Sequence, residues 1–287
     1  MSSVQNEKIA LVTGTSSGIG LSTAVLLAQR GYTVVATLRD TKKAGSLEER
    51  ARSAGVTLDI RALDVQDDTS VADCVQQVLQ TYGHIDLLVN NAGAGYLGTM
   101  EQTSDEDLRR TMEVNFFGVW RMTQAVFPAM RAAGAGRILT VSSVGGIIGQ
   151  PFNDAYCAAK FAVEGFMESL APVAQRLGID VAVIEPGPVN TNFVASVVAT
   201  SATPTDEQQR IYGPMFEVYM GGSQERFASL GQTPDQIAEI IIQAVAEDHP
   251  HFRYATSDLV KGMVAQKYTD PTGDNMVKFF NSRLGKN

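Results

Sequence analysis

The stretch KIALVTGTSSGIG at residues 8–20 joins an apolar, β-branched run to a turn that holds three glycines. The run predicts a strand at Lys8–Thr13, and the residues after the turn predict a helix through Gln29. A strand, a glycine turn and a helix N-terminus in this order place free backbone N–H groups and the positive end of a helix dipole against a pyrophosphate. A tight structural turn is the alternative, and the strand-to-helix context favours the phosphate site.

Further short β-branched runs alternate with segments of helix length through the first two thirds of the chain. They predict strands at Thr33–Leu38, Val56–Ala62, Ile85–Val89, Arg137–Val141 and Asp180–Ile184, with a last strand near Phe252–Ala255. Because these runs do not alternate polar with apolar residues, both faces of the sheet should be covered by helices. The expected fold class is α/β, a doubly wound parallel sheet of the Rossmann type with about seven strands.

Two long helices are expected to be irregular. A capping box at Thr103–Glu106 opens a periodic segment that runs to about Arg131, and Asn115 inside it predicts a kink or break, or else a solvated helix position. A second helix at about Ala155–Leu177 contains Pro172, which predicts a bend in its C-terminal half.

Residues 191–231 lack a clear strand and are interpreted as a helical lid over the substrate. Thr205 opens a local helix, and the Gly221-Gly222 pair suggests a flexible point at which the lid closes. A second capping box begins at Thr233, with Pro234 at the first helical position. These features predict a single domain over residues 1–287, with the lid inside it.

Composition excludes several classes of function. The chain has 287 residues, 44% of them hydrophobic, and a formal net charge of −8, which argues against nucleic-acid binding. Two cysteines and three histidines leave no disulfide framework and no metal-ligand spacing, so no metal is expected. No apolar run is long enough to span a bilayer, and the first residues are polar. We therefore expect a cytoplasmic protein without a membrane span.

The end of the second predicted strand bears on the choice of nicotinamide cofactor. If Leu38 holds the position that is acidic in NAD-binding sheets, Arg39 is free to meet a 2′-phosphate and the cofactor is NADP(H). If the register slips, Asp40 selects NAD(H). We prefer NADP(H), with NAD(H) possible. Asp64, after the third strand, meets either the adenine amino group or a turn or cap of its own.

Tyr156 and Lys160 stand one helical turn apart, so both side chains emerge from one face of a helix. A nearby ammonium favours the phenolate and should bring the tyrosine pKa toward the working range. Ser143 ends the fifth strand, where a hydroxyl can donate to a substrate carbonyl oxygen, and Ser142 is the competing choice. Only one of the two serines should face the site, because neighbours in a strand point to opposite sides.

At these residues the sequence resembles the short-chain dehydrogenase/reductase family. The matching motifs are the Thr-Gly-x-x-x-Gly-x-Gly loop from Thr13, Asn-Asn-Ala-Gly from Asn90, and a serine followed by Tyr-x-x-x-Lys. The resemblance implies that Tyr156 is the general acid in reduction, that Lys160 binds the nicotinamide ribose and lowers the tyrosine pKa, and that Ser143 polarises the carbonyl. It also implies that Asn115 completes a water-linked proton relay.

The same resemblance implies a set of cofactor contacts. The phosphates are met by the loop at Gly14, Thr15, Ser17, Gly18, Ile19 and Gly20; the adenosine by Leu38, Arg39, Asp64, Val65 and Asn91, followed by Ala92 and Gly93; and the nicotinamide by Tyr156, Lys160, Pro186, Gly187, Val189 and Thr191. The family also implies a homodimer or homotetramer.

Within the family, several segments look most like the 17β-hydroxysteroid and retinol dehydrogenase branch. They include Ala36–Asp40, Pro151–Cys157 and Glu185–Val189, and the match continues to Asp270–Gly273. In the steroid enzyme a lid histidine holds the far hydroxyl of the steroid, but the corresponding stretch Tyr219–Ser223 has none. That difference argues against an estrogenic substrate.

The candidate pocket residues are mainly apolar, which suits a lipophilic ketone, aldehyde or alcohol. They are Tyr96, Leu97, Gly98, Ile147, Ile148, Gly149, Phe152, Phe193, Val194, Tyr212, Met215, Phe216 and Tyr219. The leading hypothesis is an NADP(H)-dependent carbonyl reductase or alcohol dehydrogenase that transfers hydride, with Tyr156 as general acid and base. A catalytically silent nucleotide-binding sensor is the alternative. A serine hydrolase ranks last, because Ser143 lacks a Gly-x-Ser-x-Gly elbow.

Overall fold

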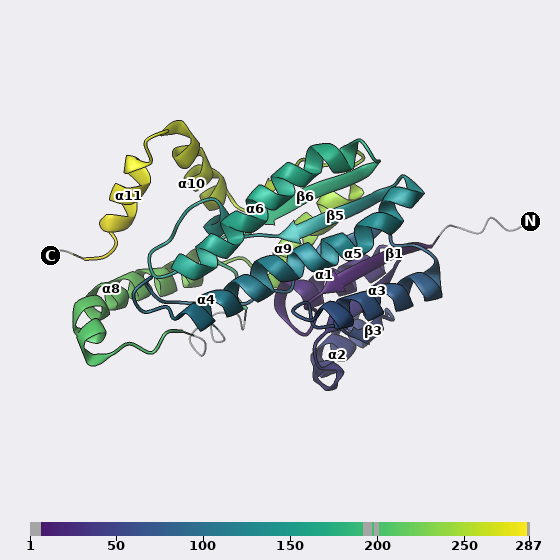
Figure 1. Cartoon of the computed structure of the whole chain (residues 1–287), viewed down its shortest axis with the longest axis horizontal. Coiled ribbons are helices and arrows are strands. Elements are labelled where there is room, and N and C mark those ends of the chain that lie inside the picture. Colours follow the sequence, from purple (N-terminus) through teal and green to yellow (C-terminus); the bar gives the residue numbers. More distant parts are fainter. Residues whose placement is uncertain (1–6, 192–196, 198–200, 286–287) are drawn as a thin grey trace, which may run out of the picture.

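A parallel sheet runs through the centre of the computed structural model, which describes residues 7–191, 197 and 201–285 (Figure 1). The described residues form seven strands in the order β3-β2-β1-β4-β5-β6-β7, and every neighbouring pair is parallel. The strands are β1 (Lys8–Thr13), β2 (Tyr32–Leu38), β3 (Asp59–Ala62), β4 (Leu87–Asn90), β5 (Gly136–Val141), β6 (Ile179–Glu185) and β7 (Arg253–Ala255). The predicted doubly wound α/β fold is confirmed.

Strand order reverses at the centre of the sheet, where β1 lies beside both β2 and β4. At this switch point the loops that leave neighbouring strands diverge, which opens the crevice where α/β sheets bind ligands. The pairings Thr13 with Thr37 and Val12 with Val89 bring the glycine loop next to the loop after β4. The predicted third strand began too early, because the Val56 amide donates to the Ala51 carbonyl at the end of the preceding helix.

Helices cover both faces of the sheet, as the continuous apolar strands predict (Figure 1). One core cluster joins the sheet to α3 (Asp68–Tyr82), α5 (Gly118–Ala133) and α6 (Asp154–Gln175). The other joins it to α1 (Gly18–Gln29), α2 (Gly45–Ser53) and α9 (Pro234–Ala246), and a short helix, η1 (Thr41–Lys43), follows β2. The central strands are therefore buried on both sides.

The predicted long helix is broken at Asn115, as expected. It consists of α4 (Asp105–Met112), a π-helical turn η2 (Glu113–Phe117) and α5. A π-turn of this kind often marks a functional position. The predicted cap was one residue early: Ser104 accepts a hydrogen bond from the Asp107 amide at 3.1 Å, whereas the Thr103 hydroxyl donates to the Thr99 carbonyl.

Three C-terminal helices extend beyond one end of the sheet (Figure 1). They are α8 (Asp206–Leu230), α10 (Asp258–Thr269) and α11 (Asp274–Asn281), and they share a third hydrophobic cluster with the turn η3 (Val144–Gly146). Thr205 and Thr233 form capping boxes, as predicted. Gly221 and Gly222 lie inside α8 rather than in a loop, which differs from the expected hinge.

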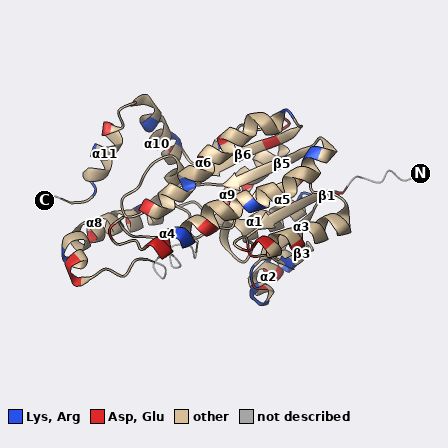
Figure 2. Cartoon of the chain, in the orientation of Figure 1, with Lys and Arg blue, Asp and Glu red and all other residues tan. Residues whose placement is uncertain are grey.

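Acidic and basic residues are interspersed along the helices in the view of Figure 2. Within residues 7–191, 197 and 201–285, the structure contains no group of three or more histidine, cysteine, aspartate or glutamate side chains that could hold a metal ion. No helix in the described part of the chain is both long and apolar enough to span a bilayer. Cys74 and Cys157 are buried, free thiols.

Candidate active site

The glycine loop after β1 packs directly against the loop after β4, and only glycine fits there. A Cβ on Gly14 would lie 2.8 Å from the Ala92 Cα, and one on Gly20 would lie 2.3 Å from the Asn91 Nδ2. Gly14 and Gly18 also have positive φ angles of 71° and 58°. No acidic residue occupies the first turn of α1 among the described residues. The loop backbone and the helix N-terminus therefore fit a dinucleotide pyrophosphate.

Two predicted phosphate contacts, Thr15 and Gly20, do not line the cavity at this loop. Thr15 is fully buried, and both its amide and its hydroxyl donate to the Thr37 carbonyl, at 3.0 and 3.1 Å. Its neighbour Ser16, which the sequence analysis missed, lines the cavity instead. Asn91 donates from Nδ2 to the Thr13 and Gly14 carbonyls at 2.9 and 3.0 Å, so its side chain shapes the loop. Its predicted contact with the adenine ribose stays a prediction.

Leu38 and Arg39 line the end of the cavity beyond the glycine loop, as predicted. Asp40 is not among the lining residues, and its side chain accepts a hydrogen bond from the Lys42 amide at the start of η1. Asp64 and Val65 also line this end. Asp64 accepts from the Gln66 amide at 3.0 Å, which is the turn role that the sequence left open.

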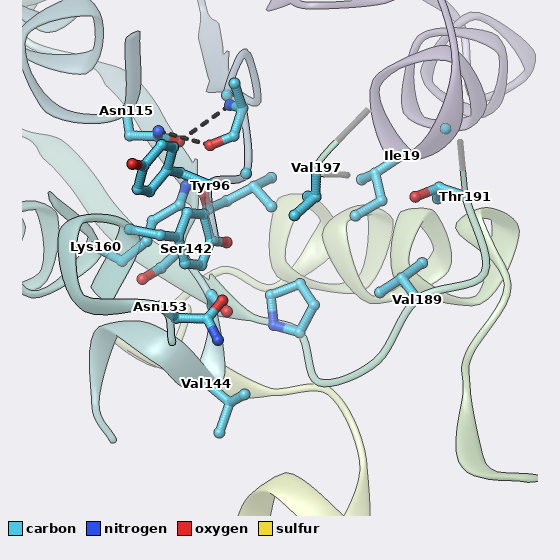
Figure 3. Close-up of a pocket in the computed structure, with 18 of the residues that line it drawn as sticks. Ile19, Tyr96, Asn115, Ser142, Val144, Asn153, Lys160, Val189, Thr191 and Val197 are labelled. Carbon is cyan, nitrogen blue, oxygen red and sulfur yellow. Dashed lines mark hydrogen bonds between the residues drawn. The ribbon is translucent and has the colours of Figure 1, made fainter. Parts of the chain in front are cut away.

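One cavity of about 720 Å³ joins the glycine loop to the C-terminal helices. The four predicted catalytic residues, Asn115, Ser143, Tyr156 and Lys160, all line it. Besides Leu38, Arg39, Asp64 and Val65, the other predicted cofactor contacts that line it are Gly14, Ser17, Gly18, Ile19, Asn91, Ala92, Gly93, Pro186, Gly187, Val189 and Thr191. Figure 3 shows Lys160, Ser142 and Asn115 on one side of the cavity, and Ile19, Val189 and Thr191 on the other.

Ser143 and Tyr156 meet at the wall between η3 and α6. The Ser143 Oγ accepts a hydrogen bond from the Gly145 amide at 3.0 Å, which leaves the hydroxyl hydrogen for another acceptor. Burial raises the pKa of Tyr156 to about 12, and the hydrogen bond with Ser143 opposes this rise. The phenol is therefore held protonated at neutral pH. Ser142 also lines the cavity, so the prediction that only one of the two serines faces it is wrong, although the buried Ser142 Oγ lies near Gly146 and Glu164.

Lys160 does not lower the tyrosine pKa in the way the sequence predicted. Its Nζ lies 5.9 Å from the centre of the Tyr156 ring and donates to the Val141 carbonyl at 2.9 Å. Burial lowers the pKa of Lys160 itself to about 8, and the Glu164 carboxylate opposes that shift. Burial of the phenol outweighs an ammonium that is directed at a backbone carbonyl.

Asn115 is fully buried in the π-turn, and its side chain clamps the loop after β4. Its Nδ2 donates to the Ala94 and Thr111 carbonyls at 2.8 and 3.0 Å, and its Oδ1 accepts from the Ala94 amide at 3.2 Å (Figure 3). These bonds place the loop beside Lys160, since a Cβ on Gly93 would lie 3.7 Å from the Lys160 Nζ. The proton relay implied for Asn115 stays a prediction.

The family model described as short chain dehydrogenase matches residues 8–202, which is more than half of the chain. The chain belongs to the short-chain dehydrogenase/reductase family. Human 17-beta-hydroxysteroid dehydrogenase type 1 is 39% identical over 275 residues, covering 94% of this chain and 83% of that protein. Bovine retinol dehydrogenase 8 is 40% identical over 279 residues, covering 94% of this chain and 88% of that protein. The predicted family is confirmed.

Solved structures place the same fold around a nicotinamide cofactor. An actinorhodin polyketide ketoreductase with NADPH has a TM-score of 0.75 and 31% identity, covering 88% of this chain and 95% of that chain. A short-chain dehydrogenase/reductase from Burkholderia phymatum in complex with NAD has a TM-score of 0.79 and 25% identity, covering 92% and 94%. This short-chain dehydrogenase is therefore an NAD(P)-dependent enzyme that acts on CH–OH or C=O groups.

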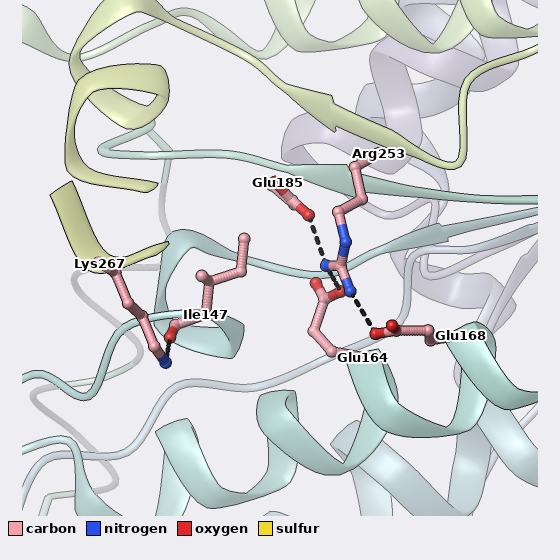
Figure 4. Close-up of polar contacts among 6 residues, drawn as sticks. All are labelled: Ile147, Glu164, Glu168, Glu185, Arg253 and Lys267. Carbon is pink, nitrogen blue, oxygen red and sulfur yellow. Dashed lines mark hydrogen bonds and ion pairs between the residues drawn. The ribbon is translucent and has the colours of Figure 1, made fainter. Parts of the chain in front are cut away.

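An ion cluster that includes two buried glutamates lies on α6, β6 and β7 of this short-chain dehydrogenase (Figure 4). Arg253 pairs with Glu164, with Glu185 at 2.9 Å and with Glu168 at 2.8 Å. Burial, and then the neighbouring Glu164, raise the pKa of Glu185 to about 7. The sequence analysis missed this cluster, although the spacing of Lys160 and Glu164 on one helix face offered a signal.

The substrate end of the cavity agrees only in part with the predicted pocket. Tyr96, Leu97 and Tyr219 line it. Phe193 and Val194 lie outside the described residues, and the remaining predicted residues are not in the wall: Gly98, Ile147, Ile148, Gly149, Phe152, Tyr212, Met215 and Phe216. Phe152 packs edge-on against Phe216 at 5.1 Å, and Ile147, Ile148 and Phe152 share a hydrophobic cluster with the lining residues Leu97 and Tyr219. Helices α8, α10 and α11 supply the lining that the sequence analysis missed, including Met220, Phe227, Met263 and Phe280.

Proposed function

We propose that this enzyme is an NADP(H)-dependent carbonyl reductase or alcohol dehydrogenase that interconverts a lipophilic ketone or aldehyde and its alcohol. The observation that carries the proposal is the Tyr156 phenol beside the Ser143 hydroxyl, in the wall of the cavity that begins at the glycine loop. A proton donor and a hydroxyl donor side by side are what a developing alkoxide requires.

In the reducing direction, a nicotinamide bound in this cavity supplies the hydride. The Ser143 Oγ accepts from the Gly145 amide, and its hydroxyl can turn to donate to the substrate oxygen. Tyr156 then donates its proton to the same oxygen. Lys160, whose ammonium is held at the Val141 carbonyl, would bind the cofactor ribose, and Asn115 holds the neighbouring loop in place.

The proposed preference for NADP(H) rests on the end of β2. Arg39 lines the cavity, and Asp40 is engaged in capping η1 and is not among the lining residues. A guanidinium there matches a 2′-phosphate, and an acidic residue in the wall would instead favour the free hydroxyl of NAD(H). A higher kcat/KM for NADH than for NADPH would contradict this preference.

We also propose that helices α4 to α6 form an interface between copies of the chain. Leu108, Phe117, Trp120 and Phe161 are each at least 39% exposed on these elements, and Trp120 stacks on Phe166 at 4.5 Å. Exposed large apolar side chains favour contact with a partner surface of similar character. A homodimer or homotetramer follows, and a monomer in sedimentation at micromolar concentration would contradict it.

The cytoplasmic location, the single domain and the lid at 191–231 stay predictions.

The test of the proposed function is the Tyr156→Phe variant, assayed by NADPH and NADH oxidation with a panel of ketones and aldehydes. Removing the phenolic proton should reduce kcat by roughly 10²- to 10⁴-fold and leave the nucleotide Kd unchanged. Tyr82→Phe is the matched control, because Tyr82 lies on α3 and donates to Asp59 away from the cavity. Full activity in Tyr156→Phe would contradict the mechanism. Nucleotide binding by the wild type without turnover on any carbonyl would favour a sensor.

A further inference from the structure

Four arginines line the cavity, and two of them, Arg226 and Arg283, come from the C-terminal helices and the segment that follows them. Arg226 projects from α8, and its Nη2 donates to the Ser223 Oγ at 3.1 Å. Arg283 follows α11, and its guanidinium lies over the Phe279 ring, 3.8 Å from its centre. Both side chains are half-buried. They come from segments far apart in the sequence, and only the fold brings them to one wall.

Several contacts place this pair with the C-terminal helices rather than with the cofactor loops. Phe280 belongs to the same hydrophobic cluster as Tyr219. A Cβ on Gly285 would lie 3.5 Å from Val218, which shows that the segment after α11 lies against α8. Burial raises the pKa of Tyr219 in the same wall, and the charges of Arg226 and Arg283 oppose that rise.

The charge of the pair is not balanced by the protein in the part of the chain that the structure describes. No carboxylate there lies within ion-pair distance of either guanidinium, and Asp64, after β3, is the one acidic residue among the described lining residues. By contrast, Arg110 in the same wall pairs with Asp107 at 2.6 Å. Burial, and then the charge of Arg226, lower the pKa of Arg283. Two guanidinium groups in one half-buried cavity wall, with no carboxylate paired to either, favour a bound anion.

We propose that Arg226 and Arg283 bind a carboxylate at the end of the substrate remote from its reacting carbonyl. The inference rests on the proposed function and narrows its substrate class to lipophilic oxo acids. The guanidinium fork matches a carboxylate in two-point hydrogen bonding. Met220, Phe227 and Met263 in the same wall supply an apolar surface for the chain that joins the two ends.

The experiment compares ω-oxo carboxylic acids of graded chain length with their methyl esters, as substrates for NADPH oxidation. When the chain of the oxo acid is long enough to span the cavity, the wild type should have a higher kcat/KM for the acid than for its methyl ester. Arg226→Met and Arg283→Met should each lower kcat/KM for the acid roughly 10- to 100-fold and leave the ester unchanged, since each removes charged hydrogen bonds. Arg210→Met is the matched control, because Arg210 is exposed on the same helix and is not among the lining residues.

The outcomes separate the inference from the proposed function. If the esters have the same kcat/KM as the acids at every chain length, the inference is wrong, but the proposed carbonyl reductase activity is not contradicted. If neither acid nor ester is reduced, the proposed function fails for these carbonyls, and calorimetry with dodecanoate and dodecanol decides the inference. A preference for dodecanoate that is lost in both variants supports it, and equal binding overturns it. Arg226→Lys and Arg283→Lys keep the charge and should retain part of the preference, which guards against a variant that only misfolds.

Discussion

The cofactor loops and the C-terminal cover of this enzyme are held in place by different forces. Around the glycine loop, backbone touches backbone: a Cβ on Gly20 would lie 2.3 Å from the Gly14 carbonyl oxygen, and Asn91 bonds two main-chain carbonyls. The cover of α8, α10 and α11 rests on side chains packed in the third hydrophobic cluster. Backbone contacts tolerate almost no substitution, whereas packed side chains can be exchanged at constant volume.

Burial follows the same division. Leu11, Leu88 and Ile138 in the central strands are fully buried. In α10 only Val260 is buried among the described residues, and in the long helix α8 only Gly213 and Tyr219 are. An element with so few buried side chains opens at a lower free energy than the sheet does. The division suits an enzyme in which the cofactor chemistry is fixed and the substrate specificity is set by a replaceable cover.

A substitution in the glycine loop should have the largest effect on nucleotide binding. Gly20→Ala puts a methyl group where two polar atoms already lie within 2.3 Å, and both belong to the loop framework. We expect loss of nucleotide binding in fluorescence titration and a lower melting temperature. Gly165→Ala is the matched control, because a Cβ in the middle of α6 meets nothing within 4 Å. There the substitution should stabilise the fold by about 0.5–1 kcal/mol. Wild-type nucleotide affinity in Gly20→Ala would contradict the steric argument.

Truncating one core side chain in the sheet and one in the C-terminal cover tests whether the two regions contribute separately to stability and to substrate binding. Leu88→Ala in β4 should lower the free energy of unfolding by about 2–5 kcal/mol and leave the KM for a lipophilic carbonyl unchanged. Phe280→Ala in the cover should raise that KM roughly tenfold, with a smaller loss of stability and the same nucleotide Kd. Denaturant unfolding and steady-state kinetics measure both. An equal loss of stability in the two variants, with no change in KM, would show that the cover and the sheet are one unit.

The same division explains what the sequence could predict. The glycine loop, the strands and the break at Asn115 depend on local backbone preferences, which a short stretch of sequence carries. The cap at Ser104 was missed by one residue, because Thr103 is an equally good cap and only its bond to the Thr99 carbonyl decides. Glycine propensity predicted a hinge at Gly221-Gly222, but both lie inside the continuous helix α8.

In the candidate site, too, the residues of local motifs could be predicted from the sequence, and those brought together by distant contacts could not. The catalytic motif residues follow directly from their spacing, and all of them line the cavity. The substrate wall depends on contacts between α8 and the segment after α11, which no local pattern encodes. Arg226 and Arg283 could therefore not be placed in one cavity from the sequence. The expected fall in the pKa of Tyr156 failed for a related reason, since burial depends on the whole fold.

The charge of the catalytic residue Lys160 depends on Glu164, which lies outside the catalytic motif. Glu164 lies one turn further along α6, is 5% exposed and pairs with Arg253 from β7. Its carboxylate favours the charged form of Lys160 and so opposes the fall of the Lys160 pKa to about 8. If the ammonium is needed for turnover, kcat/KM falls as the pH rises through this pKa, because kcat/KM reports the free enzyme.

Glu164→Gln should therefore move the basic limb of the kcat/KM profile to lower pH. The neutral amide no longer stabilises the Lys160 ammonium, which then loses its proton more easily. Glu168→Gln is the matched control, because Glu168 pairs with the same Arg253 at 2.8 Å but is largely exposed and does not act on Lys160. Its basic limb should stay in place. A limb that moves equally in both variants would show that Arg253 and the strand it comes from, rather than the Glu164 charge, control the catalytic wall.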